Sequence, residues 1–276
     1  MKIPKSILLF AKFLQFISPK LAMLFAAKLF GTPFKHKIPK REFYMNENST
    51  QTKVLISEIN KEIVVYQYGN SNKKVLLVHG WSGRGTQLYK IADELLKNGY
   101  STISFDAPAH GKSSGKTTLM PDFIASIHQL NTQFGGFEFV IGHSLGGMAT
   151  LNALKEGLKI KKAVVIGSGN KVLDIFADFI SKLKLSKKVL NLLVLYFEKK
   201  ASKTMDSLSA YIVSKEITVP VLIIHDKNDD EIPVECAYEI HKNLKGSELL
   251  ITDKLGHRKI LGDKIVIEKI INYLKN

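Results

Sequence analysis

The chain has 276 residues, of which 45% are hydrophobic and 24% are charged, values ordinary for one globular domain with a large buried core. Its single cysteine, Cys236, excludes an internal disulfide framework and is expected to be inert. No cluster of Cys and His has the spacing of a zinc site, so we expect no metal and no other cofactor.

The formal net charge of +15 is concentrated in two segments. Residues 1–50 contain nine Lys or Arg against two Glu, a net charge of +7, and residues 171–215 contain nine Lys against four acids, a net charge of +5. This asymmetry indicates two basic attachments on a nearly neutral body. Both segments carry bulky aliphatic side chains and lack a nucleic-acid-binding motif, so we expect no nucleic-acid partner.

The opening segment alternates apolar clusters with lysines, which predicts two short helices divided at Ser18-Pro19. Neither apolar run reaches the roughly 20 residues that span a bilayer. Three interpretations of residues 1–33 stay open: helices packed against the body, a helix lying in a membrane interface, or a cleaved signal peptide with Lys2 and Lys5 as its charged start.

From residue 42 onward, apolar β-branched runs alternate with helical patterns. Strands are expected at residues 54–56, 63–66, 75–78, 101–105, 139–141, 162–166, 219–226 and 248–252, and helices at residues 86–97, 121–133, 148–154, 233–244 and 262–275. The first two strands suit an antiparallel edge. The others predict an α/β fold with a mostly parallel central sheet and helices on both faces.

This alternation breaks at residues 171–215, where a lysine-rich helical pattern continues without a strand. Because open α/β sheets bind ligands at the carboxyl ends of their strands, we expect a helical lid there, inserted after the sixth strand. The predicted organisation is a helical extension over residues 1–41, a core over residues 42–170 and 216–276, and this lid. For the apolar stretch 189–197, an acyl pocket and simple burial against the body both stay open.

The motif Gly-x-Ser-x-Gly, formed by Gly142, Ser144 and Gly146, stands between an expected strand and an expected helix. In such an abrupt turn the serine takes a strained backbone conformation, and the glycines allow close packing. The hydroxyl is then lifted clear of the sheet, beside the first N–H groups of the helix. Such short motifs also occur by chance, so interpreting Ser144 as a nucleophile depends on its surroundings.

A serine hydroxyl is a weak nucleophile until a base removes its proton and an acid orients that base. Asp229 follows the expected strand that ends near His225, and His257 follows the last expected strand. Both positions fall at the sheet edge where Ser144 emerges, and the order Ser, Asp, His is that of α/β-hydrolases.

Over roughly residues 55–275 the chain resembles the α/β-hydrolase family, specifically its serine carboxylesterases and lipases. The features that carry this resemblance are His79-Gly80-Trp81, the run from Gly142 to Gly147, Asp229 four residues before Pro233, and Gly256-His257. Residues 106–113 are similar to the family's Asp-x-x-Gly-His-Gly-x-Ser loop, with Ala109 where glycine is usual. That departure bears on the shape of the loop.

The resemblance implies roles for five residues. Ser144 would be the nucleophile, His257 the general base and then acid, and Asp229 the carboxylate that orients it. The backbone N–H groups of Trp81 and Leu145 would form the oxyanion hole.

Nearby residues leave alternatives open. Asp226 and Asp230 are either turn residues or the true acid. Histidines 79, 143, 110 and 225 are expected to be structural, and Trp81 either lines a pocket or packs.

With serine at the elbow, the resemblance implies acyl transfer through an acyl-enzyme, and it argues against dehalogenases and epoxide hydrolases, which carry aspartate there. Esters are the expected substrates because alcohols leave more readily than amines. We expect a carboxylesterase or lipase-like enzyme acting on small or lipid-like esters, either cytoplasmic or loosely attached to the cytoplasmic membrane face through residues 1–33. The alternatives are a non-hydrolytic ligand receptor on the same fold, an acyltransferase and a thioesterase.

Overall fold

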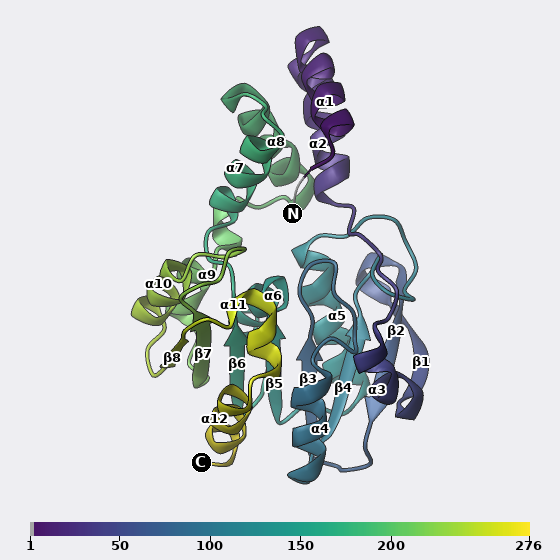
Figure 1. The fold of residues 1–276 in the computed structure, drawn as a ribbon, viewed down its shortest axis with the longest axis vertical. Helices are drawn as coiled ribbons and strands as arrows, with labels where there is room; N and C mark the ends of the chain where they lie inside the picture. The colour runs from purple at the N-terminus through teal and green to yellow at the C-terminus, as the bar shows by residue number, and fades with distance from the viewer. Residues whose placement is uncertain (1–2) are drawn as a thin grey trace.

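A computed structural model describes residues 3–276, so Lys2, one of the two lysines in the signal-peptide interpretation, lies outside the described residues. One eight-stranded sheet runs through the molecule in the order β1-β2-β4-β3-β5-β6-β7-β8 (Figure 1). Its strands are β1 (Thr50–Ile56), β2 (Lys61–Tyr68), β3 (Lys74–Val78), β4 (Ser101–Asp106), β5 (Phe139–His143), β6 (Lys162–Ile166), β7 (Val221–Asp226) and β8 (Glu248–Thr252). Strand β2 pairs antiparallel with β1 and with β4, and all other pairs are parallel.

The alternation of side chains along the strands explains why both faces of this sheet are covered. In β3, Leu76 and Val78 enter one buried cluster, whereas Val75 and Leu77 enter the other. Helices α5 (Met120–Gln133), α6 (Leu145–Lys155) and α10 (Glu235–Asn243) pack on the first face, and α4 (Tyr89–Lys97) and α12 (Lys264–Lys275) on the second. The predicted α/β fold, with helices on both faces, is confirmed.

Two helix boundaries differ from the prediction for local reasons. Helix α4 begins at Tyr89 rather than at residue 86, because the N–H of Gly85 donates to Asp106 and the hydroxyl of Thr86 donates to Glu42. Helix α6 begins directly after Ser144, earlier than the predicted residue 148, and includes Gly146 and Gly147. The shorter elements are α3 (Phe43–Asn48), α9 (Ala210–Val213), α11 (Gly256–Lys259) and five 3₁₀ turns, Lys40–Glu42, Ser57–Ile59, Asp206–Leu208, Ser214–Glu216 and Ile260–Gly262.

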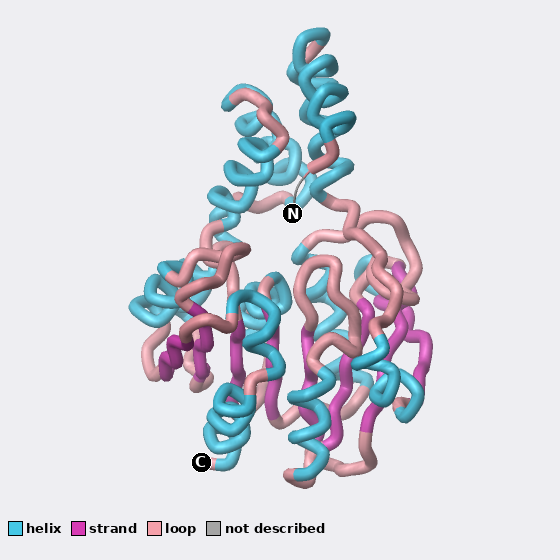
Figure 2. The backbone as a smooth tube through the Cα atoms, viewed as in Figure 1, coloured by secondary structure: helices cyan, strands magenta, loops and turns pink. Residues whose placement is uncertain are grey.

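The two basic segments of the sequence pack against each other. The predicted N-terminal helices are α1 (Lys5–Ile17) and α2 (Pro19–Phe30), divided at Ser18, and the insertion after β6 forms α7 (Val172–Lys182) and α8 (Lys187–Ala201). Helix α2 packs on both α1 and α8, and α7 packs on α8. We call these four helices the helical cap; they project from the same end of the molecule (Figures 1 and 2).

Aromatic side chains join the two halves of the cap. The ring of Phe30 in α2 lies 4.7 Å from that of Phe176, 5.2 Å from Phe179 and 5.8 Å from Phe197, measured between centroids. The rings of Phe176 and Phe197 stack at 5.4 Å. Residues far apart in the chain therefore share one apolar cluster, which ties the N-terminal segment to the insertion.

Some side chains of the apolar stretch 189–197 in α8 are buried, and others line a groove. Val189, Leu193 and Phe197 are buried among the cap helices. A groove of about 470 Å³ is lined by Leu173, Leu190, Asn191, Val194 and Leu195. Packing against α2 and α7 thus accounts for one face of this helix. Among residues 3–276, no helix is both long and apolar enough to cross a bilayer.

Candidate active site

The turn between β5 and α6 holds Ser144 in a strained backbone conformation, with φ +54° and ψ −119°. A Cβ at Gly142 would come within 2.5 Å of the carbonyl oxygen of Gly146. A Cβ at Gly146 would collide with the carbonyl oxygens of Val78 and His79. Both glycines are therefore required by close backbone contact, and the half-buried serine lies at the point where the chain turns into the helix.

His257 and Asp229 form a hydrogen-bonded pair across the loops that follow β8 and β7. The Nδ1 atom of His257 lies 2.7 Å from Oδ2 of Asp229, and both side chains are almost fully buried. The N–H groups of Glu231 and Ile232 donate to the other carboxylate oxygen at 2.9 and 2.8 Å. An ionised carboxylate only accepts, so Nδ1 carries the proton and Nε2 is left as a base.

Burial and hydrogen bonding act in opposite directions on Asp229. Burial disfavours the charged carboxylate, but the hydrogen bonds from His257, Ile232 and Glu231 outweigh it, so the pKa of Asp229 lies below its usual value. The group is therefore ionised at neutral pH and can stabilise an imidazolium on His257.

Asp226 makes different contacts from Asp229. Its buried carboxylate accepts hydrogen bonds from the N–H groups of Asn228, Leu255 and Gly256 and from the hydroxyl of Thr252. These bonds fasten the loop after β7 to the loop after β8.

Asp230 is exposed, and His225 directs Nε2 to the carbonyl oxygen of Ile232 at 3.0 Å. Burial lowers the pKa of His225. Of the three candidate acids, only Asp229 hydrogen-bonds His257.

Two neighbours bring the serine and the His–Asp pair to one place. The N–H of Ser144 donates to the carbonyl oxygen of Ile166, and the next residue, Gly167, approaches the pair so closely that its Cβ would lie 3.2 Å from His257 Nδ1. His143 lies directly before the serine, and its ring centroid is 4.6 Å from that of His257. Ser144 and His257 therefore lie on adjacent elements of the same edge.

His143 acts as a support behind the catalytic candidates. Its Nε2 lies 3.0 Å from the carbonyl oxygen of His257, and burial, then the nearby His257, lower the pKa of His143 to about 3. The neutral ring thus holds the backbone of His257. Within residues 3–276, no hydrogen bond joins Ser144 Oγ to His257; such bonds are often long until substrate is bound.

The backbone N–H groups beside Ser144 that have no acceptor in the described part of the chain include those of Trp81 and Leu145. Leu145 is the first residue of α6. A Cβ at Gly80 would lie 2.9 Å from the Cβ of Ser144, which places the Trp81 loop against the serine. These two N–H groups lie where the resemblance predicts an oxyanion hole.

Side chains on both sides hold the Trp81 loop. The N–H of Gly80 donates to Gln87 Oε1 at 3.3 Å, and the N–H of Ser82 donates to His110 Nε2 at 3.0 Å. The ring of Trp81 contacts the ring of His110 edge-on at 5.4 Å. This arrangement fixes the flanking residues and leaves the N–H of Trp81 unpaired.

Deeper in the same region, His79 accepts from the N–H of Ala107 at 3.0 Å through Nε2. Burial lowers the pKa of His79 to about 4 and that of His110 to about 3, so both rings are neutral braces. The carboxylate of Asp106 accepts from Gly85 and Lys112, each at 2.7 Å, which shapes the loop in which Ala109 adopts φ +65°. Ala109, which stands where the family usually has glycine, therefore adopts the left-handed backbone conformation that favours glycine.

One buried ion pair beside the site is not indicated by any pattern in the sequence. Glu42, only 2% exposed, pairs with Arg84 at 2.9 Å and accepts from the hydroxyl of Thr86 at 2.7 Å. The pair fastens the segment before β1 to the loop that carries Trp81. Its members lie far apart in the chain and outside every motif, so no local signal indicates it.

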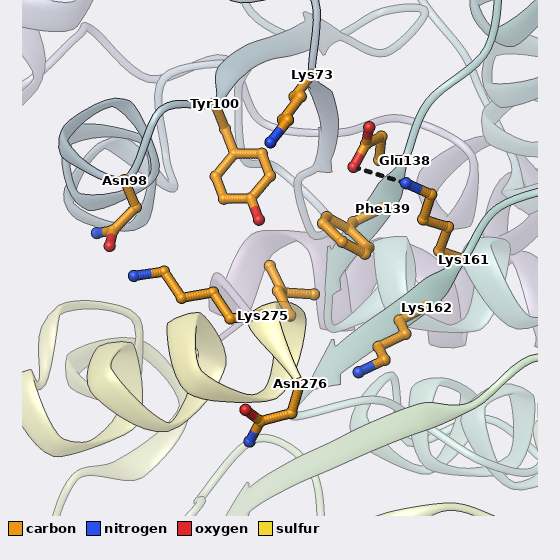
Figure 3. Close-up of a pocket in the computed structure, with 10 residues that line it drawn as sticks. Lys73, Asn98, Tyr100, Glu138, Phe139, Lys161, Lys162, Lys275 and Asn276 are labelled. Carbon is orange, nitrogen blue, oxygen red and sulfur yellow. Dashed lines mark ion pairs between the residues drawn. The ribbon is translucent and has the colours of Figure 1, made fainter.

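Another hollow lies at the opposite edge of the sheet. A pocket of about 490 Å³ is lined by Lys73, Asn98, Tyr100, Glu138, Phe139, Lys161, Lys162, Leu274, Lys275 and Asn276 (Figure 3). These residues gather at the amino ends of the strands, and Lys161 pairs with Glu138 at 3.2 Å. The pocket is therefore separate from the Ser144 edge. In residues 3–276, no group of three or more His, Cys, Asp or Glu has the arrangement of a metal site.

Comparison with known proteins agrees with this fold and motif set. A family model described as the alpha/beta hydrolase fold matches residues 73–207, and a second, described as TAP-like protein, matches residues 201–276. The chain belongs to the α/β-hydrolase family. No curated protein matches it.

Solved structures with the same fold include an esterase from Exiguobacterium antarcticum, with a TM-score of 0.63, 21% identity and coverage of 82% of this chain and 100% of that one. An esterase from Pyrococcus furiosus has a TM-score of 0.65, 20% identity and coverage of 89% and 96%. A bromoperoxidase from Bacillus anthracis has a TM-score of 0.64, 18% identity and coverage of 82% and 100%. Proteins with different names thus share this fold.

Proposed function

We propose that the protein is a serine hydrolase that cleaves carboxylic esters through an acyl-enzyme on Ser144. The observation that carries the proposal is the 2.7 Å contact between His257 and Asp229, located beside a serine held at positive φ. In this proposal Asp229 would orient the base, and the N–H groups of Trp81 and Leu145 would bind the oxyanion.

The reaction would proceed in two halves. In the first, Ser144 Oγ attacks the ester carbonyl while Nε2 of His257 takes its proton, and the oxyanion accepts hydrogen bonds from the two free N–H groups. The carbon–oxygen bond then breaks, and His257 returns the proton to the departing alcohol. In the second half, water attacks the acyl-enzyme with His257 as base, which releases the carboxylic acid and restores the serine.

Esters are proposed as substrates because of leaving-group chemistry, since an alcohol leaves a tetrahedral intermediate more readily than an amine. A thioester would use the same machinery with a thiol as the leaving group. The two esterase neighbours are consistent with this choice, but at about 20% identity their likeness concerns the fold.

The test is hydrolysis of p-nitrophenyl esters of increasing acyl length, with a parallel thioester panel. Ser144→Ala should reduce kcat/KM by about 10⁴-fold or more, because removing the nucleophile of such a site removes most of its catalysis. The matched control is Ser126→Ala, which deletes a buried serine hydroxyl on α5, away from the site, and should retain wild-type rates. Equal rates for wild type and Ser144→Ala would refute the proposal.

Other outcomes separate the remaining functions of this fold. Formation of a new ester when an alcohol acceptor is added would identify an acyltransferase. Binding of ligands without turnover of any ester or thioester would identify a receptor and would also contradict the hydrolase proposal.

A further inference from the structure

The outermost helices of the cap expose an unusual number of large apolar side chains. In α1, Leu9, Phe13 and Phe16 recur at the spacing of one helix face, with Phe10 and Ile17 beside them, and Phe16 is 91% exposed. In α2, Leu21 and Leu24 are also exposed. We call these seven residues the apolar tip; the opposite side of α1 buries Ala11.

Positive charge surrounds the apolar tip. Residues 3–41 contain eight Lys or Arg and no Asp or Glu, and Lys5, Lys12 and Lys20 are exposed on or between the tip helices. The α7–α8 turn adds Lys184, and the start of α8 adds Lys187 and Lys188, all exposed. A hydrogen bond of 2.7 Å from the N–H of Ser186 to Gln15 Oε1 places this turn beside the exposed end of α1.

The geometry points to an anionic lipid bilayer as the partner of this surface: we propose that the apolar tip inserts into the interface of a membrane while the surrounding lysines contact its negatively charged headgroups. An amphipathic helix with lysines beside its apolar face binds membranes in this way. The large exposed apolar surface is otherwise rare on a protein in water. The aromatic cluster around Phe30 joins α2 to α7 and α8, so the four helices would dock as one unit.

Charge disfavours a second copy of the chain as the occupant. A two-fold contact through the apolar tip would bring two lysine-rich surfaces together without acidic residues from either tip helix, because α1 and α2 contain none. An anionic membrane supplies the missing negative charge. The basic α7–α8 turn would contact the same headgroups.

The test is flotation of the full chain with vesicles of phosphatidylcholine alone and of phosphatidylcholine mixed with phosphatidylglycerol. We expect binding to the anionic vesicles that weakens as salt is raised, and much less binding to the neutral ones. Phe16→Ser should weaken binding to anionic vesicles roughly tenfold or more, by removing an inserted ring. Lys12→Gln should weaken it about fivefold on anionic vesicles only.

Matched controls lie at the other end of the molecule, on α12 (Figure 1). Ile265 is 70% exposed and Lys264 is also exposed, so Ile265→Ser and Lys264→Gln should bind as wild type does. Thermal unfolding of each variant checks that the fold is intact.

Absence of binding to anionic vesicles, equal binding to neutral ones, or equal losses in the α12 controls would overturn the proposal. A concentration-dependent dimer that Phe16→Ser abolishes, without vesicle binding, would also overturn it. Because the vesicle phospholipids are themselves carboxylic esters, each flotation is repeated in the Ser144→Ala background. Binding that persists without the proposed nucleophile separates membrane docking from the proposed catalysis.

Discussion

The edge around Ser144 and the helical cap are held together by different interactions. At the edge, buried polar groups have specific partners: Asp229 accepts three hydrogen bonds and Asp226 accepts four. In the cap, the contact between distant segments is aromatic packing around Phe30. Hydrogen bonds require particular donors and acceptors, whereas packing requires mainly apolar volume. The Ser144 edge can therefore be recognised from short sequence motifs, whereas the helical cap shows only apolar residues at helical spacing.

The largest expected effect is a loss of catalytic rate that distinguishes Asp229 from Asp226 at the edge around Ser144. Asp229→Asn should lower kcat about 10³- to 10⁴-fold with little loss of stability, because the acid no longer fixes the His257 tautomer. Asp226→Asn should instead lower the free energy of unfolding by about 2 kcal/mol, because an amide cannot accept from all the donors around it. Parallel ester kinetics and urea unfolding measure both.

The assigned roles of Asp229 and Asp226 would be contradicted if the two substitutions had the opposite effects. A large catalytic loss in fully folded Asp226→Asn, with near-normal rates in Asp229→Asn, would mean that Asp226 is the acid and that the hydrogen-bonded pair is structural.

A smaller effect is expected in the cap. Phe30→Ala should lower the free energy of unfolding by about 2–3 kcal/mol, since it removes a partly buried ring that joins α2 to the insertion. Hydrogen exchange should then accelerate in both α2 and α8, although they are far apart in the chain. The control Phe34→Ala removes a ring that is 51% exposed and should change stability by less than about 0.5 kcal/mol. Faster exchange in α2 alone would show that the segments do not support each other.

These two regions also show what the sequence could predict. Alternating strands and helices predict the sheet. The strand ends, together with the resemblance to α/β-hydrolases, predict that Ser144, Asp229 and His257 lie at one edge. The contacts that hold the residues of that edge in place are harder to predict from the sequence. The approach of Gly167 to His257 and the pair of Glu42 with Arg84 join residues whose contact depends on the folded arrangement of loops.

The helical cap was harder to foresee for the same reason. Two basic attachments were expected separately, and each contains apolar residues at helical spacing. Nothing in either pattern indicates that Phe30 packs against the stacked rings of Phe176 and Phe197 rather than against the sheet. Apolar periodicity predicts a buried face but not the element that covers it.

The most direct test of an activated serine is covalent labelling by a fluorophosphonate, with the adduct located by peptide mass spectrometry. We predict one adduct per chain, on Ser144, formed much more slowly in His257→Ala and absent in Ser144→Ala. No adduct on the folded wild-type protein, or an adduct that persists in Ser144→Ala, would contradict the assignment of this residue as the nucleophile.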